Sequence, residues 1–144
     1  MKPSLTAGLT HRHSFTVPRE KTVPFLYPES QLFAAMPEVF ATGFMVGLME
    51  WCCIEAIAPH LDEGEGSLGT MIEVSHEAAT PPGLTVTVDC TLEEVNGRGL
   101  VFSVTAHDGH DVIGRGRHGR AVVRWDRFLP KVDQKAALSD ASNG

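Results

Sequence analysis

The sequence is short of basic residues, and that shortage excludes one large class of partners. Its 144 residues include 12 lysines and arginines against 18 aspartates and glutamates, which gives a net charge of -6. A nucleic-acid surface needs clustered basic side chains, and only the run "GRGRHGR" (114–120) approaches such a cluster. That run suits a smaller phosphate, such as that of a nucleotide cofactor. We therefore expect no nucleic-acid partner.

Cysteines and long apolar runs are also scarce. Cys52, Cys53 and Cys90 form an odd set without the spacing of a disulfide framework, and we interpret them as buried, reduced thiols. The first residues, "MKPSLTAGLTHRHSF", lack the apolar core of a signal peptide. The longest apolar stretch, residues 40–49, is interrupted by Thr42 and two glycines. These absences predict a cytoplasmic protein without a membrane span.

What remains is the composition of an ordinary globular domain. Hydrophobic residues make up 42% and charged residues 21%, close to the averages for folded proteins. The length suits one domain with its own core, which we place at residues 1–130. The polar segment 131–144 is expected to be a disordered tail. Residues 1–12 also look like a tail, and "FTVP" (15–18) reads as a short first strand.

The middle of the chain predicts a lid followed by a central helix. Three prolines break the apolar stretch "VPFLYPESQLFAAMP" (23–37), so it is expected to be a loop or short helices, either covering a pocket as a lid or packed on the core. Thr42 is a good N-cap and Pro59 a good stop, which predicts a helix over 43–58. Because its apolar residues cover more than one face, other structure should wrap it on most sides.

Strands follow. In "LTVTVDCTLEEV" (84–95) apolar and polar residues alternate, as in a half-buried strand. Asn96-Gly97 predicts a hairpin to a returning strand over 100–106, and Asp108-Gly109 predicts a turn into a last strand over 112–125. One long enclosed helix with an antiparallel sheet is an α+β fold.

Glu50 is the unexpected residue of the central helix, because it lies among apolar neighbours. At about 100° per residue, Glu55 lies about 140° around the axis from Glu50, so the two carboxylates cannot share a face. Gly43 and Gly47 lie on the Glu50 stripe and would leave room for a ligand, while Thr42 would border the same cavity. The alternative is that Glu50 is the exposed glutamate and Thr42 only a cap.

His76 favours the first interpretation. Alternation in "TMIEVSHEAA" (70–79) places His76 on the apolar face of a strand. An inward histidine opposite an inward glutamate would shift the pKa of both groups, as happens at active sites. The alternative is a core histidine with satisfied hydrogen bonds.

Other candidates are weaker. The pairs His11-x-His13 and His107-x-x-His110 have no acidic or cysteine partner in the sequence pattern, so no metal site is expected. "GEGSLG" (64–69) lacks the residues of a phosphate-binding loop and reads as a turn. Arg120 lies among glycines that hide the direction of its side chain, and an exposed arginine is the ordinary alternative.

Five motifs together resemble the fluoroacetyl-CoA thioesterases of fluoroacetate-producing actinomycetes, over about residues 13–135. They are "YPES" (27–30), "MPEVFATGFMVGLMEWCCIEAIAPHL" (36–61), "GEGSLGT" (64–70), "TPPGLTVTV" (80–88) and "TAHDG" (105–109). The resemblance implies a hot-dog fold, in which an antiparallel sheet wraps a long central helix preceded by an apolar lid. It also implies a homodimer that acts on a small acyl-CoA substrate, with no cofactor because CoA is part of that substrate.

The resemblance also assigns residues. The catalytic threonine, glutamate and histidine of that family fall on Thr42, Glu50 and His76. The residues expected at the substrate are Gly69, Arg120 and the lid positions Val23, Leu26, Phe33 and Met36. The family's phenylalanine is replaced by Met36, and its lid histidine and glutamate by Phe25 and Ala35. A flexible thioether lines a pocket less rigidly than a ring, which bears on the discrimination between fluoroacetyl and acetyl groups.

The expected reaction is hydrolysis of fluoroacetyl-CoA to fluoroacetate and CoA, which would confer resistance to fluoroacetate. Glu50 attacks the carbonyl or activates water, Thr42 orients Glu50 or the leaving group, and His76 acts as acid and base or removes the acidic proton beside fluorine. Gly69 contributes a backbone amide. The alternatives are a short-chain acyl-CoA thioesterase of relaxed specificity and a non-catalytic acyl-CoA-binding module. A hot-dog hydratase is disfavoured, because its Asp and His are missing from this helix.

Overall fold

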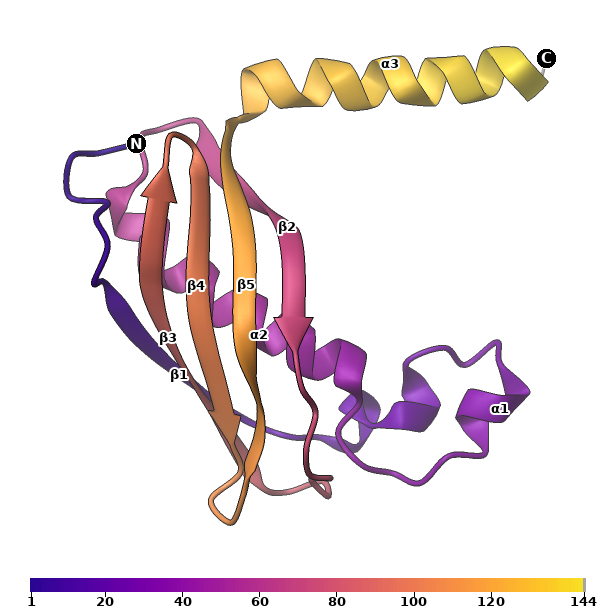
Figure 1. Ribbon diagram of the computed structural model, residues 1–144. Helices are drawn as coiled ribbons and strands as arrows, with labels where there is room; N and C mark the ends of the chain where they lie inside the picture. The colour runs from indigo at the N-terminus through magenta and orange to yellow at the C-terminus, as the bar shows by residue number, and fades with distance from the viewer. Residues whose placement is uncertain (144) are drawn as a thin grey trace.

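A five-stranded antiparallel sheet curls around one long helix in the computed structural model, which describes residues 1–143 and the side chains of residues 1–139 (Figure 1). The strands lie in the order β1-β3-β4-β5-β2. Their bounds are β1 Thr10–Thr16, β2 Glu65–Val74, β3 Thr85–Asn96, β4 Gly99–His107 and β5 Val112–Arg124. The central helix is α2, Thr42–Ile57. This arrangement confirms the predicted α+β fold.

The lid segment, which we define as residues 23–37, lies between β1 and α2. It consists of the 3-10 turn η2 (Val23–Phe25) and the short helix α1 (Gln31–Ala34), with another turn, η1 (Arg19–Lys21), before it. Ser30 caps α1 by accepting a hydrogen bond from the Phe33 amide at 3.2 Å. A third turn, η3 (Ala58–His60), follows α2. The lid segment is therefore a set of short pieces, as the prolines predicted.

The core lies between α2 and the inner face of the sheet. Alternate residues of β3 are fully buried, and those of β4 follow the same pattern. The buried residues of the helix recur every three or four positions and lie on one side of its axis: Met45, Leu48, Met49, Cys52, Cys53, Ala56 and Ile57. Trp51 and Ile54, on the other side, are 46% and 41% exposed, so the expectation that other structure wraps the helix on most sides is wrong for a single chain. Cys52, Cys53 and Cys90 are free and buried, which confirms the interpretation of the thiols.

Three elements differ from the sequence-based expectations. Strand β1 begins at Thr10, inside the stretch expected to be a tail, and none of its side chains is fully buried. Strand β2 ends at Val74, so His76 lies beyond it. Where a disordered tail was expected after residue 130, the chain continues as helix α3, Trp125–Asn143, which includes Pro130. The good helix formers in "KAAL" (135–138) favour this conformation.

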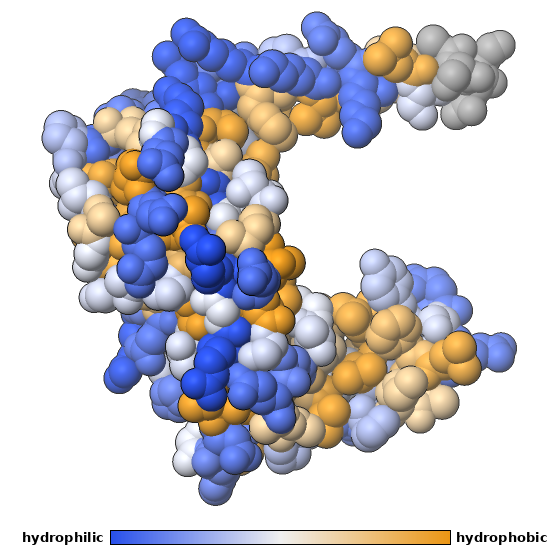
Figure 2. Space-filling view, viewed as in Figure 1, coloured by the Kyte–Doolittle hydropathy of each residue, from blue (hydrophilic) through white to orange (hydrophobic). Residues whose placement is uncertain are grey.

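Strand β2 forms one edge of the sheet, and the elements beside it extend past that edge. Helix α3 projects from one end and the lid segment from the other (Figure 1). Figure 2 shows the hollow between them, with apolar side chains on the lid side. The base of α3 is fixed because Trp125 occupies the space that a side chain at Gly66 of β2 would need. Within residues 1–143, no helix has both the length and the apolar character to cross a membrane.

Candidate active site

Thr42 and His76 form a hydrogen-bonded pair at the start of α2. Thr42 Oγ1 lies 2.7 Å from His76 Nδ1. Thr42 was predicted to be the N-cap, but the N-cap is Ala41, and Thr42 is the first helical residue. Its hydroxyl therefore pairs with the imidazole instead of capping the helix, which excludes the interpretation of Thr42 as a cap only.

Burial favours the neutral form of His76, and one of its ring nitrogens has no partner among the described residues. Burial lowers the pKa of His76 below its ordinary value, against a hydrogen bond with the backbone of Ala78 that raises it. Its Nε2 is buried and has no hydrogen-bond partner among the described residues. Buried polar atoms are nearly always paired, so this nitrogen has an unfilled hydrogen bond in a side chain that, with Thr42 and Val23, lines a pocket.

Glu50 belongs to a second group, near the middle of α2. Its carboxylate Oε2 lies 3.4 Å from Arg120 Nη1, and the side chain is 39% exposed. A Cβ atom placed on Gly69 would lie 3.2 Å from Glu50 Oε1. Glycine thus keeps the backbone of β2 close to the carboxylate. Glu50 and Gly69 line one pocket with Val46 and Ile72.

Arg120 is buried, with only 3% of its side chain exposed, so the interpretation as an exposed arginine is wrong. Its Nε donates to Ser67 Oγ at 2.8 Å, and its Nη2 donates to the Ser67 carbonyl at 2.9 Å. The remaining nitrogen, Nη1, contacts Glu50 and also lies 3.1 Å from His118 Nε2. A planar guanidinium fixed on three sides holds a carboxylate in a defined position.

His118 is the residue that the sequence analysis missed. It lies two positions before Arg120 on β5, and this spacing places both side chains on one face of a strand. It is only 1% exposed. Burial lowers the pKa of His118, and the charge of Arg120 lowers it further, while the hydrogen bond to Met71 and the charge of Glu50 oppose this. The glycines around it hid the period of two that identifies such a pair.

The two groups are separate within one chain. Thr42 and Glu50 are eight residues apart on α2, which corresponds to about 12 Å along the helix axis, and they line different pockets. The cavity expected to contain Thr42, Glu50 and His76 together is therefore not formed by a single chain. His76 lies against Thr42, and the contacts of Glu50 are with Arg120.

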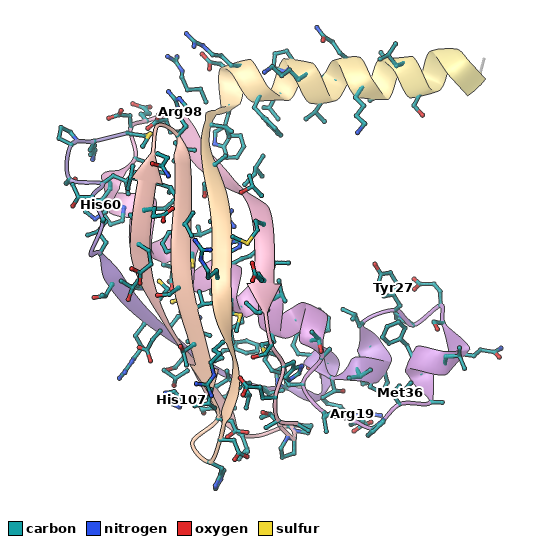
Figure 3. The ribbon with its side chains drawn as sticks, viewed as in Figure 1. Arg19, Tyr27, Met36, His60, Arg98 and His107 are labelled. Carbon is teal, nitrogen blue, oxygen red and sulfur yellow. The ribbon has the colours of Figure 1, made fainter. Side chains whose placement is uncertain are left out.

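The lid positions occupy different environments. Val23 lines the pocket of Thr42 and His76, and the end of the Leu26 side chain fills the space beside Gly43. Phe33 packs against Tyr27 with the two rings tilted and their centroids 5.8 Å apart. Met36 is 50% exposed and lies at the outer part of the lid segment (Figure 3). Only the first two positions therefore border the helix start directly.

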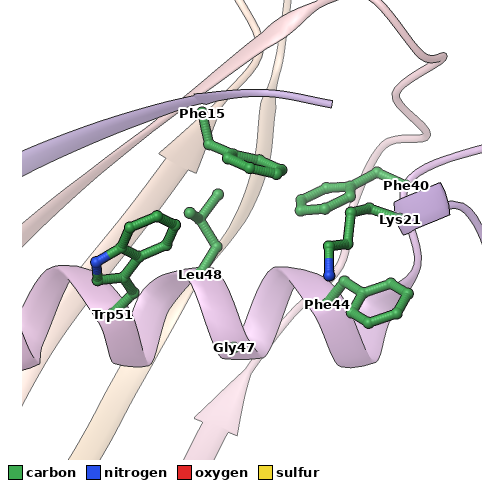
Figure 4. A pocket seen from close by; sticks show the side chains of 7 residues that line it. All are labelled: Phe15, Lys21, Phe40, Phe44, Gly47, Leu48 and Trp51. Carbon is green, nitrogen blue, oxygen red and sulfur yellow. The ribbon is translucent and has the colours of Figure 1, made fainter. Parts of the chain in front are cut away.

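Gly47 opens onto a different, apolar pocket between β1 and α2 (Figure 4). Its walls include Phe15, Phe44 and Trp51, and Lys21 Nζ lies 4.6 Å from the centre of the Phe44 ring. None of the predicted catalytic residues lines it. The expected space beside Glu50 is thus provided by Gly69, and not by Gly43 or Gly47.

Glu55 is engaged on the opposite side of α2. Its carboxylate lies 2.7 Å from His13 Nδ1 and 3.2 Å from His11 Nε2. The sequence pattern shows no acidic partner for this histidine pair, yet Glu55 of α2 is one, and these contacts join β1 to α2. Across the described part of the chain, no group of three or more histidine, cysteine and acidic residues has the geometry to hold a metal ion.

Comparison with known proteins now identifies the family. The model of a family described as fluoroacetyl-CoA-specific thioesterase matches residues 18–126. The fluoroacetyl-CoA thioesterase of Streptantibioticus cattleyicolor is 60% identical over 135 residues, which cover 94% of this chain and 97% of that protein.

Solved structures agree. The fluoroacetyl-CoA thioesterase FlK superposes with a TM-score of 0.90 at 60% identity, covering 92% of this chain and 98% of the other. A thioesterase superfamily member from Thermus thermophilus superposes with a TM-score of 0.87 at 29% identity, covering 98% and 99%. A hot-dog-like protein from Thermanaerovibrio acidaminovorans is 27% identical, with a TM-score of 0.77 and 93% of each chain covered. The chain is a hot-dog-fold thioester hydrolase and belongs to the fluoroacetyl-CoA-specific thioesterase family.

Proposed function

We propose that this protein hydrolyses fluoroacetyl-CoA to fluoroacetate and CoA, and that this reaction protects the cell from the fluorinated thioester. The observation that carries the proposal is the Thr42–His76 hydrogen bond, with a buried and unpartnered Nε2 on the far side of the imidazole. A relative of this protein adds support, because a variant of FlK has been solved in complex with fluoroacetate and CoA.

In the proposed reaction, His76 moves protons at the leaving group. When the Thr42 hydroxyl donates to Nδ1, the neutral ring carries its proton on Nε2, the nitrogen that has no partner among the described residues. This proton passes to the sulfur of CoA as the carbon–sulfur bond breaks, and Nε2 then takes a proton from the water that hydrolyses the acyl group, while the Thr42 hydroxyl keeps its own proton and orients the ring. The Thr42–His76 pair thereby supplies the acid that a thiolate leaving group needs.

Glu50 supplies the negative charge at the carbonyl. It either attacks the carbonyl carbon directly or takes a proton from the attacking water, and both routes need an ionised and oriented carboxylate. Arg120 orients it, and the open backbone at Gly69 leaves room for the acyl group beside it. The amide of Gly69 is proposed to donate to the carbonyl oxygen.

A homodimer is proposed because one chain separates the two groups. Strand β2 is an edge with unpaired backbone groups, and pairing two copies of β2 about a two-fold axis would continue the sheet. Gly69 lies near the middle of β2, so the Glu50 groups would lie near that axis, between the two Thr42–His76 pairs. Each complete site would then combine Thr42 and His76 of one subunit with Glu50 of its partner.

Relaxed acyl specificity is a second candidate, and the exposure of Met36 favours it. Half of this side chain faces solvent, and it does not line the pocket of Thr42 and His76. Because Met36 replaces the family's phenylalanine and lies outside this pocket, the lid segment should contribute less to the selectivity for fluoroacetyl over acetyl groups. The proposed setting for either activity is the cytoplasm, consistent with three free thiols.

Release of free CoA from fluoroacetyl-CoA and acetyl-CoA, measured side by side, tests these functions. Faster release from fluoroacetyl-CoA is expected. Comparable rates with both would favour the relaxed thioesterase. Tight binding of both thioesters without release of CoA would reduce the protein to an acyl-CoA-binding module and overturn the proposal.

A further inference from the structure

We propose that His118 is a positioning residue, which holds the Arg120 guanidinium in place against the Glu50 carboxylate. Only the kinetic test of this inference rests on the proposed function, because the hydrogen bonds that define the role are properties of the fold. His118 is buried on β5 and reaches toward the same point of β2 as Glu50 does. In the proposed reaction it acts through Arg120, with no contact to the thioester required.

The two hydrogen bonds of His118 define one neutral tautomer. Its Nδ1 lies 2.8 Å from the Met71 carbonyl oxygen, which can only accept, so Nδ1 carries the proton. Its Nε2 lies 3.1 Å from Arg120 Nη1, which can only donate, so Nε2 carries none. If both ring nitrogens were protonated, Nε2 and Arg120 Nη1 would both be donors and could not form this second hydrogen bond. The low pKa of His118, caused by burial and by Arg120, agrees with this assignment.

The Arg120 contacts explain why this matters for Glu50. Two nitrogens of the guanidinium are fixed by Ser67, and the third, Nη1, is shared between His118 and Glu50. The contact from Nη1 to the carboxylate is long, at 3.4 Å, whereas the contact to His118 is 3.1 Å. His118 therefore supplies the firmer of the two anchors on the nitrogen that faces Glu50.

The backbone of β2 is shaped to fit this arrangement. A Cβ atom on Gly69 would lie 3.4 Å from His118 Cε1 and 3.2 Å from Glu50 Oε1, so both side chains border the same open position. The register of β2 against β5 shifts between Gly69 and Met71, and such bulges redirect the groups around them. The Met71 carbonyl that fixes the imidazole lies directly after this shift.

Two substitutions separate the two hydrogen bonds. In His118→Asn, the amide nitrogen replaces Nδ1 and keeps the bond to Met71, but nothing reaches Arg120. In His118→Gln, the longer side chain places a carbonyl oxygen near the former Nε2, where it accepts from Arg120. We expect His118→Asn to lower kcat for fluoroacetyl-CoA by about 10²-fold with little change in KM, and His118→Gln to retain most of kcat.

Ile113→Ala is the matched control, because Ile113 is also fully buried on β5 and shares no hydrogen bond with the group. It should lower the melting temperature and leave kcat unchanged. Equal activity of the two His118 variants would overturn the role, and so would a kcat loss in Ile113→Ala as large as that in His118→Asn.

The tautomer gives a test that does not depend on activity. Nitrogen-15 NMR of the histidine rings in the wild-type protein at pH 7 should show His118 neutral, with its proton on Nδ1. A proton on Nε2, or on both nitrogens, would overturn the inference. If the wild type released no CoA, the proposed function would fail while this measurement still decided the role of His118 in the fold.

Discussion

The Thr42–His76 pair and the Glu50–Arg120–His118 group are built on opposite principles. Thr42 and His76 come from a helix start and from the chain beyond a strand end, they share one hydrogen bond, and His76 keeps a free nitrogen. The other group rests on the middle of α2 and on paired strands, and each nitrogen of its buried guanidinium has a partner.

This difference separates two tasks within one site. A group that transfers protons must have a vacant position for its substrate, and the imidazole of His76 has one. A group that stabilises charge works best when its dipoles and charges are already oriented, and Arg120 is oriented by contacts on every side. Substitutions in the two regions should therefore fail in different ways.

The largest effect is expected from Glu50→Gln, which keeps the shape of the side chain and removes its charge. The turnover of fluoroacetyl-CoA should fall by at least about 10³-fold, because neither attack nor activation of water proceeds from a neutral amide. Release of CoA is the measurement, and elution volume on gel filtration checks that the fold and the assembly are retained. Hydrolysis at the wild-type rate would remove Glu50 from the mechanism.

His76→Ala addresses the other region and should cost about 10²-fold or more in kcat. The pKa of His76 is lowered below 6.5, so the neutral imidazole persists as the pH falls to that value. In the wild type, kcat/KM should therefore decline only below about pH 6.5, and the variant should lack this limb. Coinciding pH–rate profiles would identify His76 as a core residue.

Met36→Phe tests whether the lid segment contributes to the preference for fluoroacetyl over acetyl groups. Met36 lies outside the pocket of Thr42 and His76 in one chain, so this variant tests whether the lid reaches the acyl group in the proposed dimer. If it does, a ring should raise the ratio of kcat/KM for fluoroacetyl-CoA over acetyl-CoA by about tenfold, since apolar pockets separate such small groups by roughly 1–3 kcal/mol. Leu32→Phe, at a lid residue that is 78% exposed, is the control and should leave the ratio unchanged. A ratio that stays level or falls in Met36→Phe would place selectivity outside the lid.

The smallest effect is expected from mixed subunits, which test whether the two regions meet across a dimer. Thr42→Ala and Glu50→Gln proteins, each inactive alone, are denatured together and refolded. Half of the dimers are then mixed, and in each of these one of the two sites is intact, so about a quarter of the wild-type rate should return. The refolded wild type and each variant refolded alone are the controls. No recovery would place both regions in the site of a single chain.

The sequence predicted most where burial alternates regularly. Strand β3 was expected over 84–95 and occupies Thr85–Asn96, and α2 was expected over 43–58 and occupies Thr42–Ile57. The turn at Asn96-Gly97 is confirmed, with Gly97 at a φ of 58°. Both β3 and α2 bury one clear face against the core.

The rest could not be predicted because its causes are not local. Strand β1 has no fully buried residue, so its pattern does not stand out. Strand β2 ends at Val74, so its alternation does not extend to His76. Around Arg120 and His118, the glycines of β5 have no side chains, so the alternation of apolar and polar residues that marks the buried face of a strand is lost. The identities of Thr42, Glu50 and His76 came from a resemblance, and their separation into two groups became visible only in three dimensions.

The absence of a side chain at residue 69 has a consequence for redesigning the acyl preference. Alanine is normally the mildest replacement, but a methyl group here would approach Glu50 Oε1 to 3.2 Å and His118 Cε1 to 3.4 Å. Both neighbours belong to the group that holds the charge, and moving either of them would disturb its contact with Arg120. A protein engineer seeking a larger substrate should therefore leave residue 69 unchanged and vary the lid segment, where Met36 tolerates change because half of it already faces water.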